Sequence, residues 1–294
     1  MHEKKLYPAI AAANTGGVAA DGVSFDGRGD YLYRNTDLAG NTDSTQFTFA
    51  CWLYWNGNQA TLISSTDDIA NRYRGVRVYL QSNGAFVFDV FNDAGAIQMR
   101  CETPAYTIPV NTVTSVLISA DVSDSTRRHC YISDNKMPDS VFQNYINTML
   151  NFTAEHHILG AEYISSTAQE FFGGRMAHLF RANEYANLDV EPNRRILITD
   201  KGFPVDDLRS SWISAGYAEP VFYFPMRRAD TAYINDGVGG DFEQNGVLDT
   251  AQVGFNEWQC VASSINSDLS NTEYLSEPST GGYIAYSAIT LVFI

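Results

Sequence analysis

The stretch Phe47-Thr48-Phe49-Ala50-Cys51-Trp52-Leu53-Tyr54-Trp55 decides the fold class. Large or apolar side chains occupy every second position from Phe47 to Trp55, which is the period of a β-strand that buries one face. Trp52 and Tyr54 lie on the opposite face, so we expect that face to be partly covered as well. The stretch therefore predicts a long strand in the middle of a β-sandwich.

The surrounding sequence repeats this β pattern at shorter length. Two alternating runs, 75–81 and 85–91, flank Ser82-Asn83-Gly84, and an Asn-Gly turn between such runs strongly indicates a hairpin. Further strands are expected at 97–101, 112–121, 129–133, 155–161, 175–181 and 221–226. Short strands separated by Asn, Asp, Gly and Ser are typical of an antiparallel sandwich or barrel. The fold class that we expect is therefore all-β.

Helical patterns are scarce. Residues 141–150 are expected to form one short turn or helix, and residues 191–198 begin with Glu191-Pro192, which favours a helical turn. Neither segment is long enough to cover a parallel sheet, whose two faces need helices, so the pattern excludes an α/β fold.

Composition and charge limit the classes of function. Of the 294 residues, 45% are hydrophobic and 18% charged, so the chain has enough apolar side chain to fold. The 34 acidic and 19 basic residues give a net charge of −15, which argues against nucleic acid as the main partner. The apolar C-terminal residues, 283–294, are too few for a bilayer span of about 20 residues, so we expect no membrane partner.

The sequence divides into three parts. Residues 21–261 carry the strand pattern and are expected to form one sandwich domain, because such domains commonly reach about 250 residues. Residues 1–20 and 262–294 are expected to form N-terminal and C-terminal arms. The first 13 residues resemble a secretory leader only in part, because Pro8 interrupts a short apolar run. We therefore do not expect secretion by that route.

The four cysteines, Cys51, Cys101, Cys130 and Cys260, are widely spaced and contain no Cys-x-x-Cys pair of the kind that binds zinc. Three of them lie in strand-like segments, where buried free thiols are expected. Disulfides are the alternative, and four cysteines allow three pairings between which the spacing does not choose.

Three segments occur in a familiar order. Ser24-Phe25-Asp26-Gly27 precedes Asp30-Tyr31-Leu32, the strand at 47–55 follows, and Gly173-Gly174 opens a late alternating run. This order resembles that of the concanavalin A-like and laminin-G-like jelly rolls. The resemblance implies an antiparallel jelly-roll β-sandwich.

A narrower likeness lies between residues 188 and 242. It consists of Leu188-Asp189, Asn193-Arg194-Arg195, Lys201-Gly202-Phe203-Pro204-Val205, and Asn235 with Gly237, Gly239, Gly240 and Phe242. These residues are similar to the closing part of jelly rolls in tailed-bacteriophage structural modules. The resemblance covers residues 20–255 and implies a virion component of a phage head, neck or tail. Residues 206–212 depart from the Gly-rich and Pro-rich sequence of those relatives, which leaves the role of that loop open.

The sequence lacks the patterns of the common hydrolases. Glycoside hydrolysis needs two carboxylates about 5–10 Å apart, and the Glu-x-Asp-x-x-Glu run of laminarinase-like relatives does not occur. A Gly-x-Ser-x-Gly nucleophile elbow does not occur either. Alternation places one of His156 and His157 in the core and the other in solvent. We therefore expect a noncatalytic protein.

Two loops combine side chains that can bind a sugar. They contain Asp67, Asp68, Asn71 and Tyr73, and Asn235 and Asp236. Sugar sites pair an aromatic platform with Asp and Asn, and calcium prefers the same oxygen ligands. A host-surface glycan, with or without calcium, is thus the small ligand to consider, while no other cofactor is expected. The alternative is that these residues only form turns.

The C-terminal arm points to assembly. Tyr283, Tyr286, Leu291 and Phe293 lie far from any local core, so we expect them to add a strand to a neighbouring chain. Our leading hypothesis is a noncatalytic virion structural protein of the head decoration, neck, collar or tail. Its partners would be copies of itself and phage proteins, and it would join the virion in the host cytoplasm. The alternatives are a receptor-binding or glycan-binding fibre or collar protein and, third, a polysaccharide depolymerase.

Overall fold

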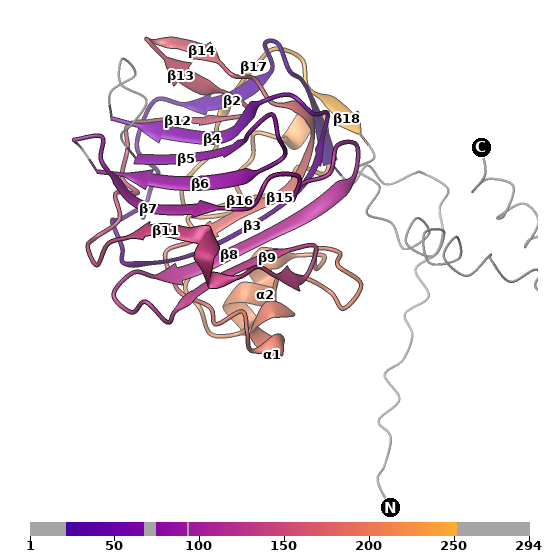
Figure 1. Cartoon of the computed structure of the whole chain (residues 1–294). Coiled ribbons are helices and arrows are strands. Elements are labelled where there is room, and N and C mark those ends of the chain that lie inside the picture. Colours follow the sequence, from indigo (N-terminus) through magenta and orange to yellow (C-terminus); the bar gives the residue numbers. More distant parts are fainter. Residues whose placement is uncertain (1–21, 68–74, 93, 252–294) are drawn as a thin grey trace, which may run out of the picture.

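The computed structural model describes residues 22–67, 75–92 and 94–251, and it shows two eight-stranded antiparallel sheets packed face to face (Figure 1). This is the predicted jelly-roll β-sandwich. Both arms, including Tyr283, Tyr286, Leu291 and Phe293, lie outside the described residues. No helix in the described ranges is long and apolar enough to cross a bilayer.

The sheet that contains the 47–55 stretch is called sheet A. Its strand order is β10 (Asn135–Lys136), β9 (Arg128–Ile132), β8 (Val113–Asp121), β3 (Gln46–Trp55), β15 (Gly173–Ala182), β1 (Gly22–Asp26) and β18 (Asp249–Ala251), and β16 (Phe222–Phe224) also pairs with β15. Long strands therefore lie in the middle of sheet A, and the shortest strands lie at its edges.

The opposing sheet is called sheet B. Its strand order is β11 (Phe142–Tyr145), β7 (Ile97–Glu102), β6 (Phe86–Phe91), β5 (Gly75–Leu80), β4 (Ala60–Thr66), β12 (His156–Leu159), β2 (Tyr31–Arg34) and β17 (Glu243–Asn245). A separate hairpin of β13 (Glu162–Ile164) and β14 (Thr167–Gln169) follows β12, and two single 3₁₀ turns cover Asp139–Val141 and Ala229–Thr231.

The alternation of the 47–55 stretch correctly predicts its two faces. Phe47, Phe49 and Trp55 belong to the apolar core between the sheets, where the Phe47 ring stacks on Phe88 of sheet B with centroids 5.0 Å apart. Trp52, on the other face, is also fully buried. The predicted pair of histidines divides as expected, with His157 buried and His156 half-buried.

A second apolar layer covers the outer face of sheet A. Residues 183–219 contain two short helices, α1 (Glu191–Arg194) and α2 (Leu208–Ser214), which lie beyond β9 in Figure 1. Their segment packs Leu188, Leu197 and Trp212 against Trp52 and Phe180 of the sheet. Because of this layer, the outer side chains of sheet A such as Trp52 and Phe180 are buried.

Two expectations about local structure are wrong. The segment 141–150 is not a helix: its residues Phe142–Tyr145 form the edge strand β11, because Phe142 buries its ring in the sandwich opposite Cys101. The segment 206–212 is not a simple loop, because most of it enters α2. Asp207 caps that helix by accepting the Ser210 N–H at 3.0 Å, and Leu208 and Trp212, one turn apart, both enter the second apolar layer.

The expected free thiols are confirmed where the structure describes them. Cys51, Cys101 and Cys130 are buried and unbonded to one another, and Cys260 lies outside the described residues. Burial raises the pKa of the Cys51 thiol, which keeps it protonated and unreactive.

Candidate functional site on sheet B

A row of directly paired residues crosses all eight strands of sheet B on its outer face. From β17 to β11 these residues are Glu243, Tyr33, Ile158, Ser64, Arg77, Asp89, Arg100 and Gln143. Their chain neighbours, such as Leu32, Val78 and Phe88, face the core, so alternation turns the row away from the core. The row organises the surface on which we place the candidate site.

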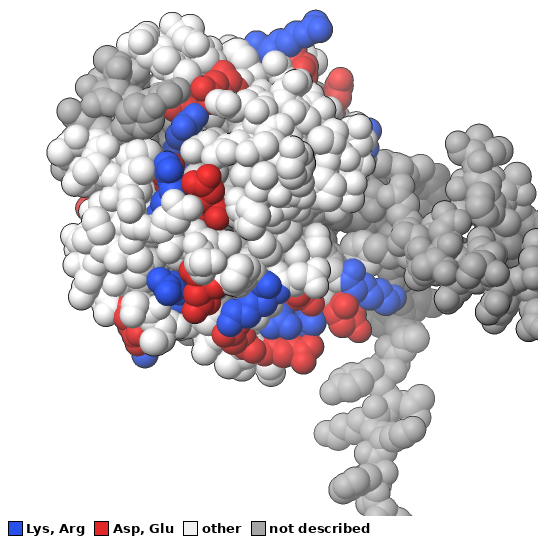
Figure 2. Space-filling model, in the orientation of Figure 1, with Lys and Arg blue, Asp and Glu red and all other residues white. Residues whose placement is uncertain are grey.

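The middle of the row is a ladder of ion pairs. Arg77 contacts Glu162 and Glu170 at 2.7 Å each, and Asp89 accepts two hydrogen bonds of 2.7 Å from Arg100. In Figure 2 basic and acidic side chains lie close together on the face of the molecule that is shown. Burial raises the pKa of the Asp89 carboxyl, and the Arg100 guanidinium limits that rise.

The ion pairs of the ladder limit the reactivity of its carboxylates. Glu162 and Asp89 are fully buried, and each is held by an arginine. Arg77 also stacks over the Tyr79 ring, with its guanidinium carbon 3.9 Å from the ring centroid. Carboxylates that are paired with arginine in this way are poor nucleophiles and poor general acids. The ladder therefore acts as a rigid support for the neighbouring residues of sheet B.

An open groove of about 300 Å³ lies beside the ladder, where β7, β11 and the β5–β6 loop meet. Its lining residues are Asn83, Ala85, Glu102, Thr103, Pro104, Ala105, Ser140, Val141 and Gln143. The Glu102 carboxylate accepts a hydrogen bond of 3.1 Å from Gln81 and lies 3.7 Å from Arg100, so the ladder fixes its position. Ser140 and Gln143 are exposed, which leaves the groove with hydroxyl and amide groups near one carboxylate.

Tyr106 comes directly after Ala105, a lining residue of the groove, and has an unusual backbone conformation. Its side chain is 83% exposed, and its φ of 63° lies in the left-handed region, which is costly for an aromatic residue. The Tyr106 N–H donates to the Asn83 carbonyl at 2.7 Å, which joins the tyrosine loop to the β5–β6 loop. Gly84 permits the two loops to lie this close together, because a Cβ at position 84 would lie 2.8 Å from the Ile108 carbonyl oxygen. An exposed aromatic in a strained backbone beside a groove is typical of a binding site.

A second group of rings lies at the β2 edge of the same face. Tyr31 has its ring 5.9 Å from that of Tyr33 and 6.1 Å from that of Phe171, and all three residues are half-buried. The Tyr33 hydroxyl donates to Glu243 at 2.6 Å, and this hydrogen bond raises the pKa of the tyrosine. Sheet B thus carries aromatic surface at one edge and the polar groove near the other.

Only one residue of the first predicted sugar loop is described. Asp67 directly follows β4, is exposed, and accepts the Glu155 N–H at 3.1 Å, whereas Asp68, Asn71 and Tyr73 lie outside the described residues. Asp67 follows the last residue of β4, at the end of β4 that lies opposite to the β5–β6 hairpin. Asp67 therefore lies at the other end of sheet B from the groove.

The second predicted loop is a structural turn. The Asn235 amide oxygen accepts N–H groups of Tyr223 and Gly237, and its nitrogen donates to the carbonyls of Val221 and Gly240. All four hydrogen-bonding positions of this amide are used within the fold. The neighbouring Asp236 is exposed, and burial with the nearby Asp207 charge raises the pKa of its carboxyl. Asp67 follows β4 of sheet B, whereas the Asp236 N–H donates to the Tyr223 carbonyl of β16 in sheet A.

The ladder and the groove are parts of the site that we did not find from sequence. In the sequence, Arg77, Asp89 and Arg100 stand out only as charged residues inside strand-like runs, and this is the signal from which the ladder could be found. The groove brings together residues 83–85, 102–105 and 140–143, which no spacing rule connects. Among the described residues, no group of three or more His, Cys, Asp or Glu side chains could hold a metal ion.

Comparison with known proteins gives a likeness of fold alone. No protein-family description and no curated sequence matches the chain. A putative carbohydrate-binding protein of Bacteroides ovatus is 11% identical over 78% of this chain and 59% of its own length, with a TM-score of 0.49. A heptameric SAP-like pentraxin of Limulus polyphemus is 15% identical over 57% and 79%, with a TM-score of 0.41.

A third similar structure is the CBM40 module of a Ruminococcus gnavus sialidase bound to α2,3-sialyllactose. It is 15% identical over 57% of this chain and 92% of its own length, with a TM-score of 0.42. Jelly-roll domains named for carbohydrate binding thus occur among the similar structures. At these identities the likeness concerns the sandwich only, and the site must be judged from its own residues.

Proposed function

We propose that this chain is a noncatalytic glycan-binding module whose ligand lies in the groove between β7, β11 and the β5–β6 loop. The observation that carries the proposal is the exposed, strained Tyr106 beside a groove lined by Asn83, Glu102, Ser140 and Gln143. An aromatic face packs on the apolar side of a sugar ring, while amide, hydroxyl and carboxylate groups bond its hydroxyls.

Charge favours a neutral or weakly charged glycan over other ligands. The chain has a net charge of −15, and Glu102 places a carboxylate in the groove, which disfavours nucleic acid and strongly acidic polymers. The groove is open and polar, which suits a hydrated polysaccharide better than an apolar small molecule. Because the ladder carboxylates are held by arginines, the module is expected to bind a glycan without cleaving it.

The test is binding to host-surface polysaccharide by calorimetry, with wild type and four variants. Gln143→Ala and Tyr106→Asn should each weaken binding about tenfold, a loss of one or two contacts. Gln169→Ala, which removes an exposed amide from the separate β13–β14 hairpin, is the matched control and should bind normally.

Asp67→Ala tests the loop predicted from sequence. Loss of binding in Asp67→Ala with normal binding in Gln143→Ala would move the site to that loop. Release of reducing ends from the polysaccharide would instead indicate a depolymerase.

The setting that we propose for the module is a tailed-phage virion, as a head-decoration, neck, collar or tail component. The support is the sequence likeness between residues 188 and 242, whose residues build the layer over sheet A and the Asn235 turn. That layer leaves sheet B free to face outward from a particle. Deleting residues 283–294 should prevent incorporation into particles, and normal occupancy of the truncated chain in a particle density map would contradict the assembly role of the arm.

A further inference from the structure

Arg181 places a positive charge in the interior of the sandwich. The β15 strand contains a bulge between Ala177 and Phe180, where His178 has a φ of 48°. The bulge shifts the alternation of the strand by one residue, so that Met176 before it and Leu179 after it both face the core. Arg181 then also points inward, and it is only 3% exposed.

The surroundings of the Arg181 guanidinium are mostly aromatic. Its central carbon lies 4.7 Å from the centroid of the Phe152 ring and 5.1 Å from that of Phe222. One terminal nitrogen donates to the Asn41 amide oxygen at 2.5 Å, while the buried Nε has no hydrogen-bond partner. The guanidinium therefore has an unsatisfied donor in a region from which solvent is excluded.

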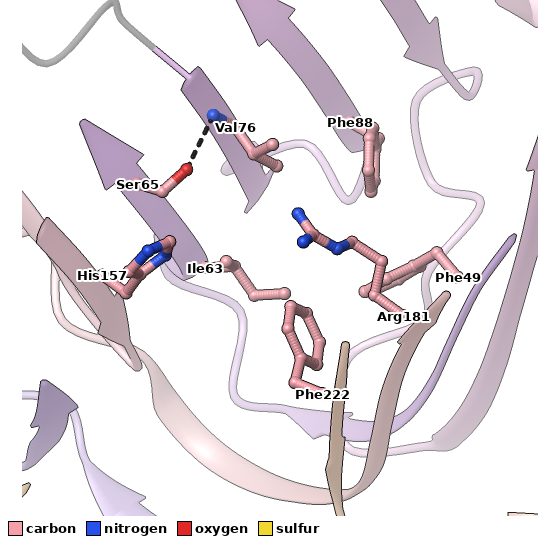
Figure 3. A pocket seen from close by; sticks show the side chains of 8 residues that line it. All are labelled: Phe49, Ile63, Ser65, Val76, Phe88, His157, Arg181 and Phe222. Carbon is pink, nitrogen blue, oxygen red and sulfur yellow. Dashed lines mark hydrogen bonds between the residues drawn. The ribbon is translucent and has the colours of Figure 1, made fainter. Parts of the chain in front are cut away.

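A small cavity lies against this guanidinium (Figure 3). Its volume is about 10 Å³, about the room that one water-sized guest requires. Side chains of both sheets line it, including Phe49, Ile63 and Phe88, and Ser65 and His157 are its other polar lining residues. Ser65 accepts the Val76 N–H at 2.9 Å, which leaves its hydroxyl proton for a guest.

The charge of Arg181 has no carboxylate in direct contact among the described residues. The titratable groups near it are His157 and Asp37. Burial, followed by the Arg181 charge, lowers the pKa of His157 and keeps this histidine neutral. Asp37 does not contact Arg181 directly: it lies 3.4 Å from the Asn41 nitrogen and 3.8 Å from His157 Nε2, and its side chain is 44% exposed. An interior cation with so remote a counter-charge is costly in a medium of low dielectric constant.

We propose that the cavity binds one monoatomic anion, a halide such as chloride, against the Nε of Arg181. The cavity is too small for a polyatomic anion, and a water would satisfy the donor without compensating the charge. The bound ion would be an internal structural ligand of the sandwich, separate from the groove on sheet B.

Crystals of the full chain grown or soaked in sodium bromide provide the direct test. We expect one anomalous bromide peak inside the sandwich, within hydrogen-bond distance of Arg181 Nε, in wild-type crystals. Density for a water at that position with no anomalous signal would overturn the proposal. This experiment needs no variant, so it decides the question even if substitution of Arg181 prevents folding.

Thermal unfolding provides a second test in solution. In sodium bromide at about ten times the dissociation constant, the wild-type midpoint should rise by about 2–4 °C more than in sodium sulfate of equal ionic strength. Arg181→Met should lose this difference, because the methionine fills similar space without the charge. Arg175→Met, on the same strand but over the Tyr54 ring, is the control and should retain it. An equal response of all three proteins to bromide would show that the effect is a general salt effect and would refute the site.

Discussion

Asp89 and Arg100 lie directly opposite each other on neighbouring strands, and two hydrogen bonds of 2.7 Å join the carboxylate to the guanidinium. The aspartate side chain is 1% exposed, and that of the arginine is 26% exposed. The pair thus fixes the register of β6 and β7 next to Glu102, which lines the groove. A buried carboxylate that is paired with one arginine in this way is sensitive to loss of either charge.

Replacing Asp89 by Asn should lower the free energy of unfolding by about 3 kcal/mol, because the change breaks a buried pair and leaves the Arg100 guanidinium with the longer contact to Glu102 at 3.7 Å. Urea unfolding followed by tryptophan fluorescence measures the difference. Asp230→Asn is the matched control, since the Arg228–Asp230 pair is mostly exposed and should contribute little. Equal effects of the two substitutions would show that the ladder does not stabilise sheet B.

His178 predicts a dependence of stability on pH. Burial, followed by the charge of Arg227, lowers the pKa of this histidine to about 3. Below its usual pKa of about 6.5 the unfolded chain binds a proton that the folded chain takes up only near pH 3. The contribution of the neutral His178 to the free energy of unfolding is therefore complete above pH 6.5. It is lost progressively as the pH falls, by about 4 kcal/mol at pH 3. His178→Asn, which tolerates the positive φ, should make unfolding less pH-dependent between pH 3 and 6.5. An unchanged pH profile would show that His178 is protonated in the folded state.

Gly84 should be the glycine on which the groove depends most. Gly84→Ala combines a left-handed backbone at φ 78° with a Cβ that would press on the Ile108 carbonyl and the Tyr106 backbone. Gly202→Ala is the matched control, because Gly202 has φ 85° and open space around its Cβ position. Gly202→Ala should cost about 1 kcal/mol and leave glycan binding intact, whereas Gly84→Ala should cost more and weaken binding. Normal binding by Gly84→Ala would mean that the position of the Tyr106 loop does not matter for the ligand.

Tyr106 should show opposite effects on stability and binding. Asn adopts the left-handed region readily, so Tyr106→Asn should raise the free energy of unfolding by up to about 1 kcal/mol while it removes the aromatic surface. Ser166→Asn, at φ 66° in the β13–β14 turn, should also be neutral or stabilising but should bind glycan normally. Urea titration and calorimetry on the same protein samples measure both quantities. A Tyr106→Asn protein that is more stable and binds normally would remove the tyrosine from the site.

The faces of sheet A were predictable because one period governs the whole of β3. The same rule fails at Arg181, since the bulge at His178 reverses the alternation and nothing in the sequence marks the shift. Helix α2 was missed because a single pair one turn apart, Leu208 and Trp212, is too short a repeat to distinguish from a loop. The groove depends on the spatial meeting of three distant segments, which requires the topology of both sheets.

The second apolar layer has a consequence for synthesis of the chain. Trp52 and Ala50 of β3 are covered by side chains that come as late as Trp212 and Tyr223. A nascent chain that has made β3 still exposes the outer apolar side of this strand until about 170 more residues have been translated. At roughly 5–20 residues per second this interval lasts about 10–30 s, long enough for chaperones to act or for aggregation to begin. Truncations that end before α2 should therefore accumulate as insoluble protein even though they retain β1 to β15.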